Sequence, residues 1–340
     1  MLNHEMDRLD LVLRRMRSRL TIEEKQTIQR QLRGFYGELL LGEWLEEQLG
    51  KQWQVYYNLN LNLDSLRQYD FILVAKGCCV VVECKHYPGH LTYKDHQYYL
   101  GNQPLGGNIM QAMTDRMQAM RRLVGHQMRV EGVMIFTHEE SSFDLPNLPD
   151  FTLIPRPRVQ NYLNSLNKQH LQATTDQEFV YFNNLITKHR TTNPYHHPGQ
   201  TIDDWCKLST GIDCASCAST HIEVQHHSTS CLFCGHQEQK QDLILRSVRE
   251  LTVLFPQEDQ IITTSRVHQY LGQRVRRVTV QTTLSKHLIQ HGSNRDRYYE
   301  YSKPDREFNS KDISLRLSQA NITKRSYRPP KRNFRFLYGS

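Results

Sequence analysis

Two carboxylates and a lysine are placed where they could do chemistry together. Asp70 lies in a short apolar run, and Glu83 and Lys85 lie at the end of the next one. Because side chains alternate along a strand, Glu83 and Lys85 point to one face while Val82 and Cys84 point to the other. A hairpin between the two runs can bring Asp70 beside Glu83. Such a pair suits Mg²⁺ or Mn²⁺, and the lysine can orient or deprotonate a water and offset phosphate charge.

This arrangement is typical of metal-assisted phosphodiester hydrolysis, but it has a structural alternative. A simple ion pair between Glu83 and Lys85, with Asp70 in a turn, would place the same residue types at the same spacing. The surroundings of Glu83 favour a site, because five consecutive apolar residues precede it and an acid is costly there without partners.

Four cysteines form a second constellation, in two spaced pairs. Two residues separate Cys214 from Cys217 and Cys231 from Cys234, and thirteen residues separate the pairs. This spacing predicts a closed structural zinc site in which each pair forms a knuckle and backbone amides support the thiolates. The alternatives are two chance pairs of free thiols, or a site in which a nearby histidine replaces one cysteine. Cys206 falls outside the pattern.

The C-terminal third carries a basic, helical segment. Runs at 243–255, 264–271 and 279–290 have the pattern of three short helices, and a strand is expected at 298–301. Hydroxyl, lysine and arginine groups along and beside the third helix suit phosphates and base edges. A plain three-helix domain and a protein-docking domain remain alternatives. The candidate nucleic-acid contacts are Arg274, Arg276, Arg277, Thr282, Ser285, Lys286, Arg295 and Arg297.

The elements that must position the carboxylates form an α/β unit. Helical spacing covers residues 1–50, with a capping signal at Thr21, and returns over 108–124. Strands are expected at 55–63, 69–74, 78–84 and 130–137, the second and third joined by a hairpin. This order predicts a mixed sheet flanked by helices.

Composition restricts the setting of these modules. Residues 236–340 hold twenty Lys and Arg against ten Asp and Glu, whereas the preceding residues are slightly acidic, so we expect a polyanion partner for the basic end. A hydrophobic content of 38% is enough for packed cores. The longest strictly apolar run is five residues, too short for a membrane span or a secretory signal. We therefore expect a cytoplasmic protein with no membrane partner.

Several ordered motifs resemble one known family. They are Gly37-Glu38 in a helix, Gln68-Tyr69-Asp70 entering a strand, the segment Glu83-Cys84-Lys85-His86-Tyr87-Pro88-Gly89, and Asn108-Ile109-Met110-Gln111 opening a helix. Together they look like the nuclease-related domain (NERD) family of the PD-(D/E)xK nuclease superfamily. Tyr69, Phe71 and Ile109 depart from the residues common there, and none of these changes removes a catalytic group.

The resemblance implies a restriction-endonuclease-like core with a divalent metal. Asp70 and Glu83 would hold Mg²⁺ or Mn²⁺, Lys85 would serve the attacking water, Glu38 would add a carboxylate, and Gln111 would lie near the site. The four-cysteine segment is similar to zinc ribbons of bacterial type I topoisomerases. Residues 240–302 look like a winged helix-turn-helix.

The predicted organisation follows from these modules. We expect a divalent-metal-dependent nuclease that acts on DNA, with a homodimer as a candidate assembly. The alternative is a non-catalytic DNA-binding or regulatory protein on the same fold. The expected segments are an N-terminal helical extension (1–30), a nuclease-related domain (31–168), a helix and linker (169–205), a zinc ribbon (206–238), a winged-helix-like domain (239–302) and a basic tail (303–340).

Overall fold

The computed structural model describes residues 2–145, 150–171, 176–192, 199–293 and 296–300. The chain divides into two compact units, one made of residues 30–196 and the other of the chain before and after them. Part of the predicted linker (193–198), Arg295 and the predicted basic tail lie outside the described residues. Among the described helices, none is both long and apolar enough to cross a membrane.

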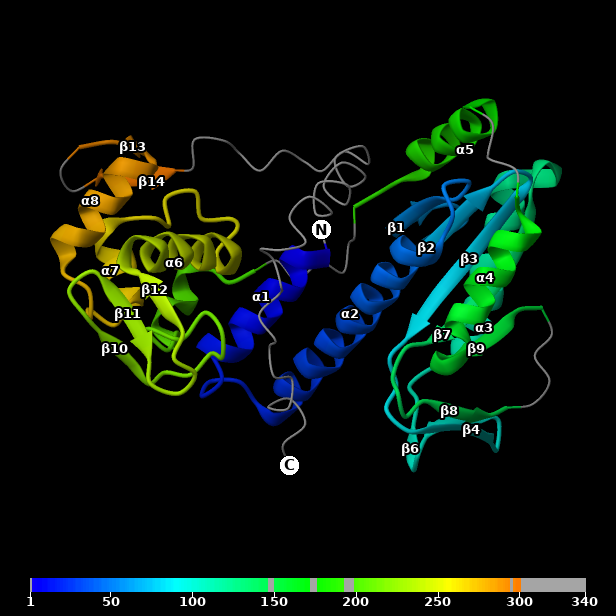
Figure 1. The fold of residues 1–340 in the computed structure, drawn as a ribbon, viewed down its shortest axis with the longest axis horizontal. Coiled ribbons are helices and arrows are strands. Elements are labelled where there is room, and N and C mark those ends of the chain that lie inside the picture. Colours follow the sequence, from blue (N-terminus) through cyan, green and yellow to red (C-terminus); the bar gives the residue numbers. More distant parts are fainter. Residues whose placement is uncertain (1, 146–149, 172–175, 193–198, 294–295, 301–340) are drawn as a thin grey trace. The chain divides into compact units, whose positions relative to one another are not determined.

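A five-stranded mixed sheet forms the centre of the first unit (Figure 1). Its strands are β1 (Gln54–Asn62), β2 (Leu66–Ala75), β3 (Cys78–Lys85), β7 (Arg129–Phe136) and β9 (Thr152–Pro155). They lie in the order β1-β2-β3-β7-β9, antiparallel from β1 to β3 and parallel from β3 to β9. The predicted hairpin joins β2 and β3, with Gly77 in the left-handed region at a φ of 67°. The mixed sheet predicted from the sequence is confirmed.

Helices cover both faces of this sheet. They are α2 (Ile22–Gln48), α3 (Ile109–Val124), α4 (Val159–Gln169) and α5 (Asp176–His189). Helices α2 and α4 bury their leucines against the face that carries Phe71, Val80 and Val82. Helices α3 and α5 pack on the opposite face, which carries Ile72 and Val81. Because α3 connects the parallel strands β3 and β7, its position over the sheet follows from the crossover connection.

A second, smaller sheet was not predicted. It consists of β4 (His90–Lys94), β5 (Gln97–Leu100), β6 (Gln103–Pro104) and β8 (Ser142–Asp144). Asp95 and His96 both have positive φ, which is the geometry of a two-residue hairpin turn between β4 and β5. These strands are short and largely exposed, so their alternation left little signal in the sequence.

The other unit combines the start of the chain with the residues after 198. Its elements are α1 (Leu2–Arg15), a 3₁₀ helix (Ile202–Lys207), the strands β10 (Ile222–Val224), β11 (Ser228–Cys231) and β12 (Gln237–Gln239), the helices α6 (Lys240–Leu254), α7 (Thr264–Tyr270) and α8 (Arg277–His287), and the strands β13 (Ile289–His291) and β14 (Tyr298–Glu300). The first three strands form one antiparallel sheet and the last two form a hairpin.

One expected boundary in this unit is wrong. The third helix was predicted to continue to Gln290, but α8 ends at His287 and Ile289–His291 pairs with Tyr298–Glu300. Leu288 turns to extended backbone and buries its side chain, which removes Ile289 from the helix. A β-branched residue at this point fits a strand as well as it fits a helix, so its pattern did not separate them.

A buried ion network ties α1 to the C-terminal helices. Arg15 donates to Asp213 at 2.8 Å and to Glu250 at 2.9 Å, and Arg246 donates to Glu250 at 2.9 Å. The Tyr270 hydroxyl also donates to Glu250, at 2.7 Å. Burial opposes the charge on Glu250, but Arg15 and Arg246 outweigh it and lower its pKa to about 2. The N-terminal helix is therefore built into this unit through charged groups that are costly to leave unpaired.

Candidate active site and metal centre

The β2–β3 hairpin determines where the two predicted carboxylates meet. Its antiparallel pairing ends at Phe71 opposite Val82, so the next residues along the register are Asp70 and Glu83. Instead of a further ladder bond, the backbone N–H of Cys84 donates to Asp70 Oδ2 at 2.8 Å. Both carboxylates are buried. The structure therefore brings Asp70 and Glu83 together at the end of the hairpin.

Two cations contact Glu83. Lys85 Nζ lies 2.6 Å from Glu83 Oε1, so the expected shared face of these two side chains is confirmed. Arg116, from α3, places Nε 3.6 Å from Glu83 Oε2 and donates to the backbone oxygen of Gln68 at 2.7 Å. Arg116 is not among the site residues predicted from the sequence. The feature of the sequence that could have identified it is a basic residue next to the apolar stripe that contains Met113 and Met117, on the side of α3 that faces the sheet.

The charges at this site oppose one another. Burial, followed by the charge of Glu83, raises the pKa of Asp70 to about 7. Burial also opposes the charge on Glu83, but Lys85 and Arg116 outweigh it and lower the pKa of Glu83. Burial likewise disfavours the Lys85 ammonium, yet Glu83 and Asp70 raise its pKa above the usual value. Lys85 therefore carries a positive charge beside the two carboxylates, which suits charge stabilisation better than proton abstraction.

Glu38 approaches the site from the opposite face of the sheet. It lies on α2, and its charge contributes, after burial and Asp70, to the raised pKa of the Cys84 thiol. The preceding residue is a glycine for a packing reason, since a Cβ on Gly37 would lie 2.5 Å from the Cβ of His86. The absence of that atom lets α2 approach the end of β3 closely.

Gln111 has a different environment. Its side chain is exposed on α3, where Nε2 donates to Asp115 at 2.8 Å, and its backbone N–H is capped by Asn108. It lies one turn or more before Arg116 on the same helix. Of these two α3 residues, it is therefore Arg116 that the structure brings to Asp70, Glu83 and Lys85.

A cavity lies away from these carboxylates. Its volume is about 410 Å³, and Trp44, Gln48 and Arg156 are among the residues that line it. The Arg156 guanidinium lies over the Trp44 ring, 5.5 Å from its centre, and pairs with Glu139 at 3.0 Å. None of the predicted site residues lines this cavity. The candidate active site is therefore identified by its carboxylates and its lysine and not by the presence of a cavity.

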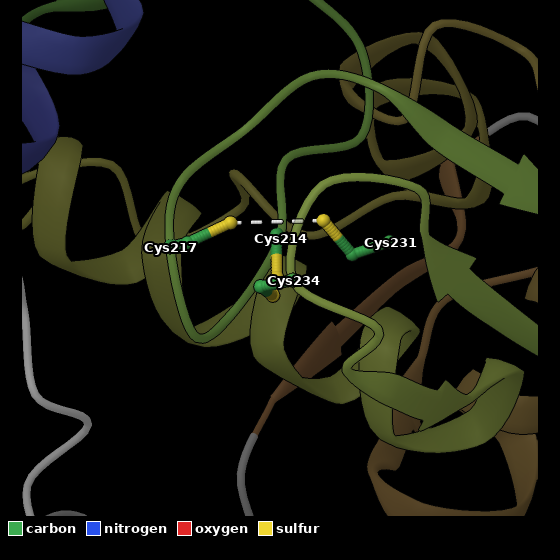
Figure 2. Close-up of side chains that lie close together, drawn as sticks. All are labelled: Cys214, Cys217, Cys231 and Cys234. Atoms are coloured by element: carbon green, nitrogen blue, oxygen red, sulfur yellow. Dashed lines mark hydrogen bonds between the residues drawn. The ribbon is translucent and has the colours of Figure 1, made fainter.

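The four cysteines come together as their spacing predicts (Figure 2). The sulfur atoms of Cys214 and Cys234 lie 3.6 Å apart, as do those of Cys217 and Cys231, and all four lie within 4.8 Å of one another. Four thiolates at this spacing fit tetrahedral Zn²⁺, whose bonds to sulfur are about 2.3 Å long. The cluster can therefore hold a metal ion without a histidine ligand.

Each pair forms a tight knuckle. The backbone N–H of Ala218 donates to the oxygen of Cys214, and that of Gly235 donates to the oxygen of Cys231, both with positive φ at the donor. Burial opposes thiolate formation at Cys231, but the backbone amides of Cys234 and Phe233 outweigh it and, with the neighbouring thiols, lower its pKa to about 6. The predicted support of thiolate by backbone amides is present at this knuckle.

The candidate nucleic-acid contacts divide into three groups. Thr282, Lys286, Arg276 and Arg277 are exposed on or beside α8, while Leu284 and Leu288 are buried, as predicted. Ser285 is exposed but its hydroxyl lies 3.2 Å from that of Tyr299, and Arg274 donates to the backbone oxygen of Ile222. Arg297 is half-buried next to β14, and Arg295 is not among the described residues.

Comparison with known families agrees with this geometry. The family model described as the nuclease-related domain matches residues 33–137. That range runs from α2 to the end of β7 and contains Asp70, Glu83 and Lys85. No curated protein and no solved structure matches the chain. Residues 33–137 of this chain are therefore similar to the nuclease-related domain, and the unit that contains them has a mixed α/β core.

Proposed function

We propose that the chain is a divalent-metal-dependent nuclease that hydrolyses phosphodiester bonds in DNA. The observation that carries this proposal is the convergence of Asp70 and Glu83 at one end of a hairpin, with Lys85 on the same face 2.6 Å from Glu83. Two facing carboxylates repel each other when buried, and a cation would relieve that repulsion.

The donor set fits a hard cation. Glu83 Oε2 is buried and makes no hydrogen bond to any described residue, and Asp70 carries a raised pKa because of its burial beside Glu83. Oxygen ligands of this kind suit Mg²⁺ and Mn²⁺. When bound, such an ion would supply positive charge to polarise the scissile phosphate.

The protein's own groups have separate tasks in this proposal. Asp70 and Glu83 hold the cation, and the backbone N–H of Cys84 fixes the Asp70 carboxylate through its 2.8 Å hydrogen bond. Lys85, which stays protonated, orients the attacking water and offsets charge that develops on the phosphate. Arg116, whose Nε lies 3.6 Å from the second oxygen of Glu83 without a hydrogen bond to it, offers a further cation to a phosphate, while Glu38 adds negative charge from α2.

The test is cleavage of labelled single- and double-stranded DNA with Mg²⁺ or Mn²⁺. We expect the parent chain to cut, and Glu83→Gln to lose cutting by a factor of at least about 10³ while keeping its affinity for DNA. Glu140→Gln changes an exposed glutamate and is the matched control. Equal cutting by the parent and Glu83→Gln would refute the site. If the parent binds DNA but does not cut it with either metal, the alternative of a non-catalytic DNA-binding protein is favoured.

We further propose that the C-terminal unit recruits the nucleic acid. The order of three helices followed by the β13–β14 hairpin supports a winged-helix-like domain, with exposed Arg276, Arg277, Thr282 and Lys286 around α8. Zinc at the four-cysteine centre would hold the fold and take no part in cleavage. The reduced cysteines of this centre also suit a cytoplasmic setting.

Salt dependence tests this recruitment. Each phosphate contact contributes about 0.9 to the slope of log K against log salt. We expect Lys286→Gln to weaken DNA binding and to reduce that slope by about 1, whereas Lys51→Gln, an exposed lysine of the other unit, leaves it unchanged. An unchanged slope in Lys286→Gln would remove α8 from the interface.

A further inference from the structure

A third group of potential ligands lies in the nuclease-related unit, apart from both sites described above. Cys78 begins β3, Glu131 lies in β7, and His170 follows the last residue of α4. One potential ligand atom of each, a sulfur, a carboxylate oxygen and an imidazole nitrogen, lies within 4.8 Å of the others. These residues are far apart in the sequence, so the fold alone assembles them.

The sheet and α4 explain why they meet. In the parallel pairing of β3 with β7, Cys78 is opposite Arg129 and Val80 is opposite Glu131, which places Cys78 and Glu131 close together. Helix α4 packs across the same face of the sheet through Val159, Leu163 and Leu166, so its C-terminal end reaches the start of β3.

His170 is held in place, and one of its ring nitrogens lacks a hydrogen-bond partner among the described residues. Its backbone N–H donates to the oxygen of Leu166 at 3.1 Å, and its ring lies edge-on to Trp53 with 5.1 Å between centres. Nε2 is buried and makes no hydrogen bond to any described residue. A buried ring nitrogen without a partner is unfavourable, and a metal ion at this position would satisfy it.

We propose that Cys78, Glu131 and His170 bind a Zn²⁺ ion. Thiolate, imidazole and carboxylate are the three ligand types that zinc takes in proteins, and three protein ligands leave a fourth position for solvent. In a tetrahedral zinc site the ligand atoms lie roughly 3.3–3.8 Å apart, so small side-chain movements close the site from its present spacing. Without a metal ion, Glu131 pairs with Arg129, and this ion pair would compete with the metal for the carboxylate.

This site is separate from the proposed nuclease centre. Cys78 and Glu83 lie at opposite ends of β3, about 16 Å apart at the usual rise per residue. They also point to opposite faces, since Cys78 packs on the α2 and α4 side and Glu83 contacts Arg116 of α3. The ion would join β3, β7 and the end of α4, and would stabilise the sheet without contacting the substrate.

Metal content of the purified full-length chain tests the proposal. With zinc at the four-cysteine centre, the parent should contain two zinc ions per chain by elemental analysis, and His170→Ala should contain one. The expected total of two zinc ions depends on the zinc site proposed above for the four cysteines. The expected loss of one zinc ion in His170→Ala does not depend on it. His126→Ala, an exposed histidine in the 3₁₀ turn Gly125–Gln127, should keep the parental content.

A second pair of variants separates metal loss from misfolding. Cys78→Ser preserves the size of the side chain and should also lose one zinc ion, whereas Cys79→Ala changes a neighbour that packs on the opposite face and should lose none. The parental zinc content in both His170→Ala and Cys78→Ser would overturn the site. Failure of DNA cleavage would leave these zinc counts unchanged, so the two proposals fail independently.

Discussion

Replacement of Asp70 by asparagine provides a demanding test of the electrostatics at the hairpin. The asparagine oxygen can still accept the hydrogen bond from the Cys84 N–H, which measures 2.8 Å with the aspartate, but the charge that faces Glu83 is removed. We expect the variant to lose cleavage and, in the absence of Mg²⁺, to be more stable than the parent at alkaline pH. Such a result would mean that the charge of Asp70, which the proposed function needs, lowers the stability of the folded chain.

The magnitude follows from the pKa of Asp70, which burial and Glu83 raise to about 7. An unfolded aspartate is ionised above about pH 4, so between about pH 4 and 7 the native state binds more protons than the unfolded state. Stability therefore falls as the pH rises through this window. At about 1.4 kcal/mol per pH unit, the parent should lose up to about 3 kcal/mol between pH 5 and pH 8 relative to Asp70→Asn.

Urea unfolding at pH 5 and pH 8 measures this difference, with Mg²⁺ omitted and no chelator added. Other titrating groups, including His86, are common to both chains and cancel when the two are subtracted. Asp144→Asn, an exposed aspartate, should follow the pH response of the parent. Parallel pH dependence of the parent and Asp70→Asn would refute the reasoning. Under the same reasoning, Mg²⁺ affinity of the parent should rise as the pH increases through about 7, because the proton competes with the ion.

Two further predictions concern packing and buried charge, and both are read from denaturant unfolding. Gly37→Ala should destabilise the chain by about 1–3 kcal/mol, because the new Cβ meets His86, whereas Gly34→Ala, with open space around it, should be neutral or stabilising. An equal effect at the two glycines would contradict the close approach of α2. Arg15→Ala should cost about 3–5 kcal/mol because it leaves buried carboxylates short of a partner, and the exposed Arg17→Ala should cost less than about 0.5 kcal/mol. A small effect at Arg15 would show that its ion pairs contribute little.

Much of the candidate active site could be predicted because its information is local. The alternation of side chains along a strand predicted the faces of Glu83 and Lys85 on β3, and the short hairpin determines the register that pairs Phe71 with Val82 and brings Asp70 next to Glu83. The cysteine spacing likewise determined the knuckles. In each case the relevant residues lie within one hairpin or one short module, where periodicity and turn chemistry fix the geometry.

The remaining features depend on how elements dock, which no local pattern records. Arg116 reaches Glu83 only because α3 crosses the sheet at that point. The group formed by Cys78, Glu131 and His170 requires three elements separated by long stretches of chain. No pattern in the sequence distinguishes Arg15, although it pairs with Glu250, 235 residues away. Such contacts follow from tertiary packing and not from period or spacing.

The pairing of Arg15 with Glu250 has a consequence for synthesis on the ribosome. The nuclease-related unit is continuous in the chain and can fold as soon as its residues have emerged, since domains generally fold as units during translation. Helix α1 is made before them, yet its Arg15 finds its partners only once Asp213 and Glu250 have been made. A nascent chain thus carries a folded nuclease-related unit before the unit with the four-cysteine cluster and α8 can close. Because Arg15 pairs with a residue 235 positions later in the chain, this unit completes its fold after the nuclease-related unit.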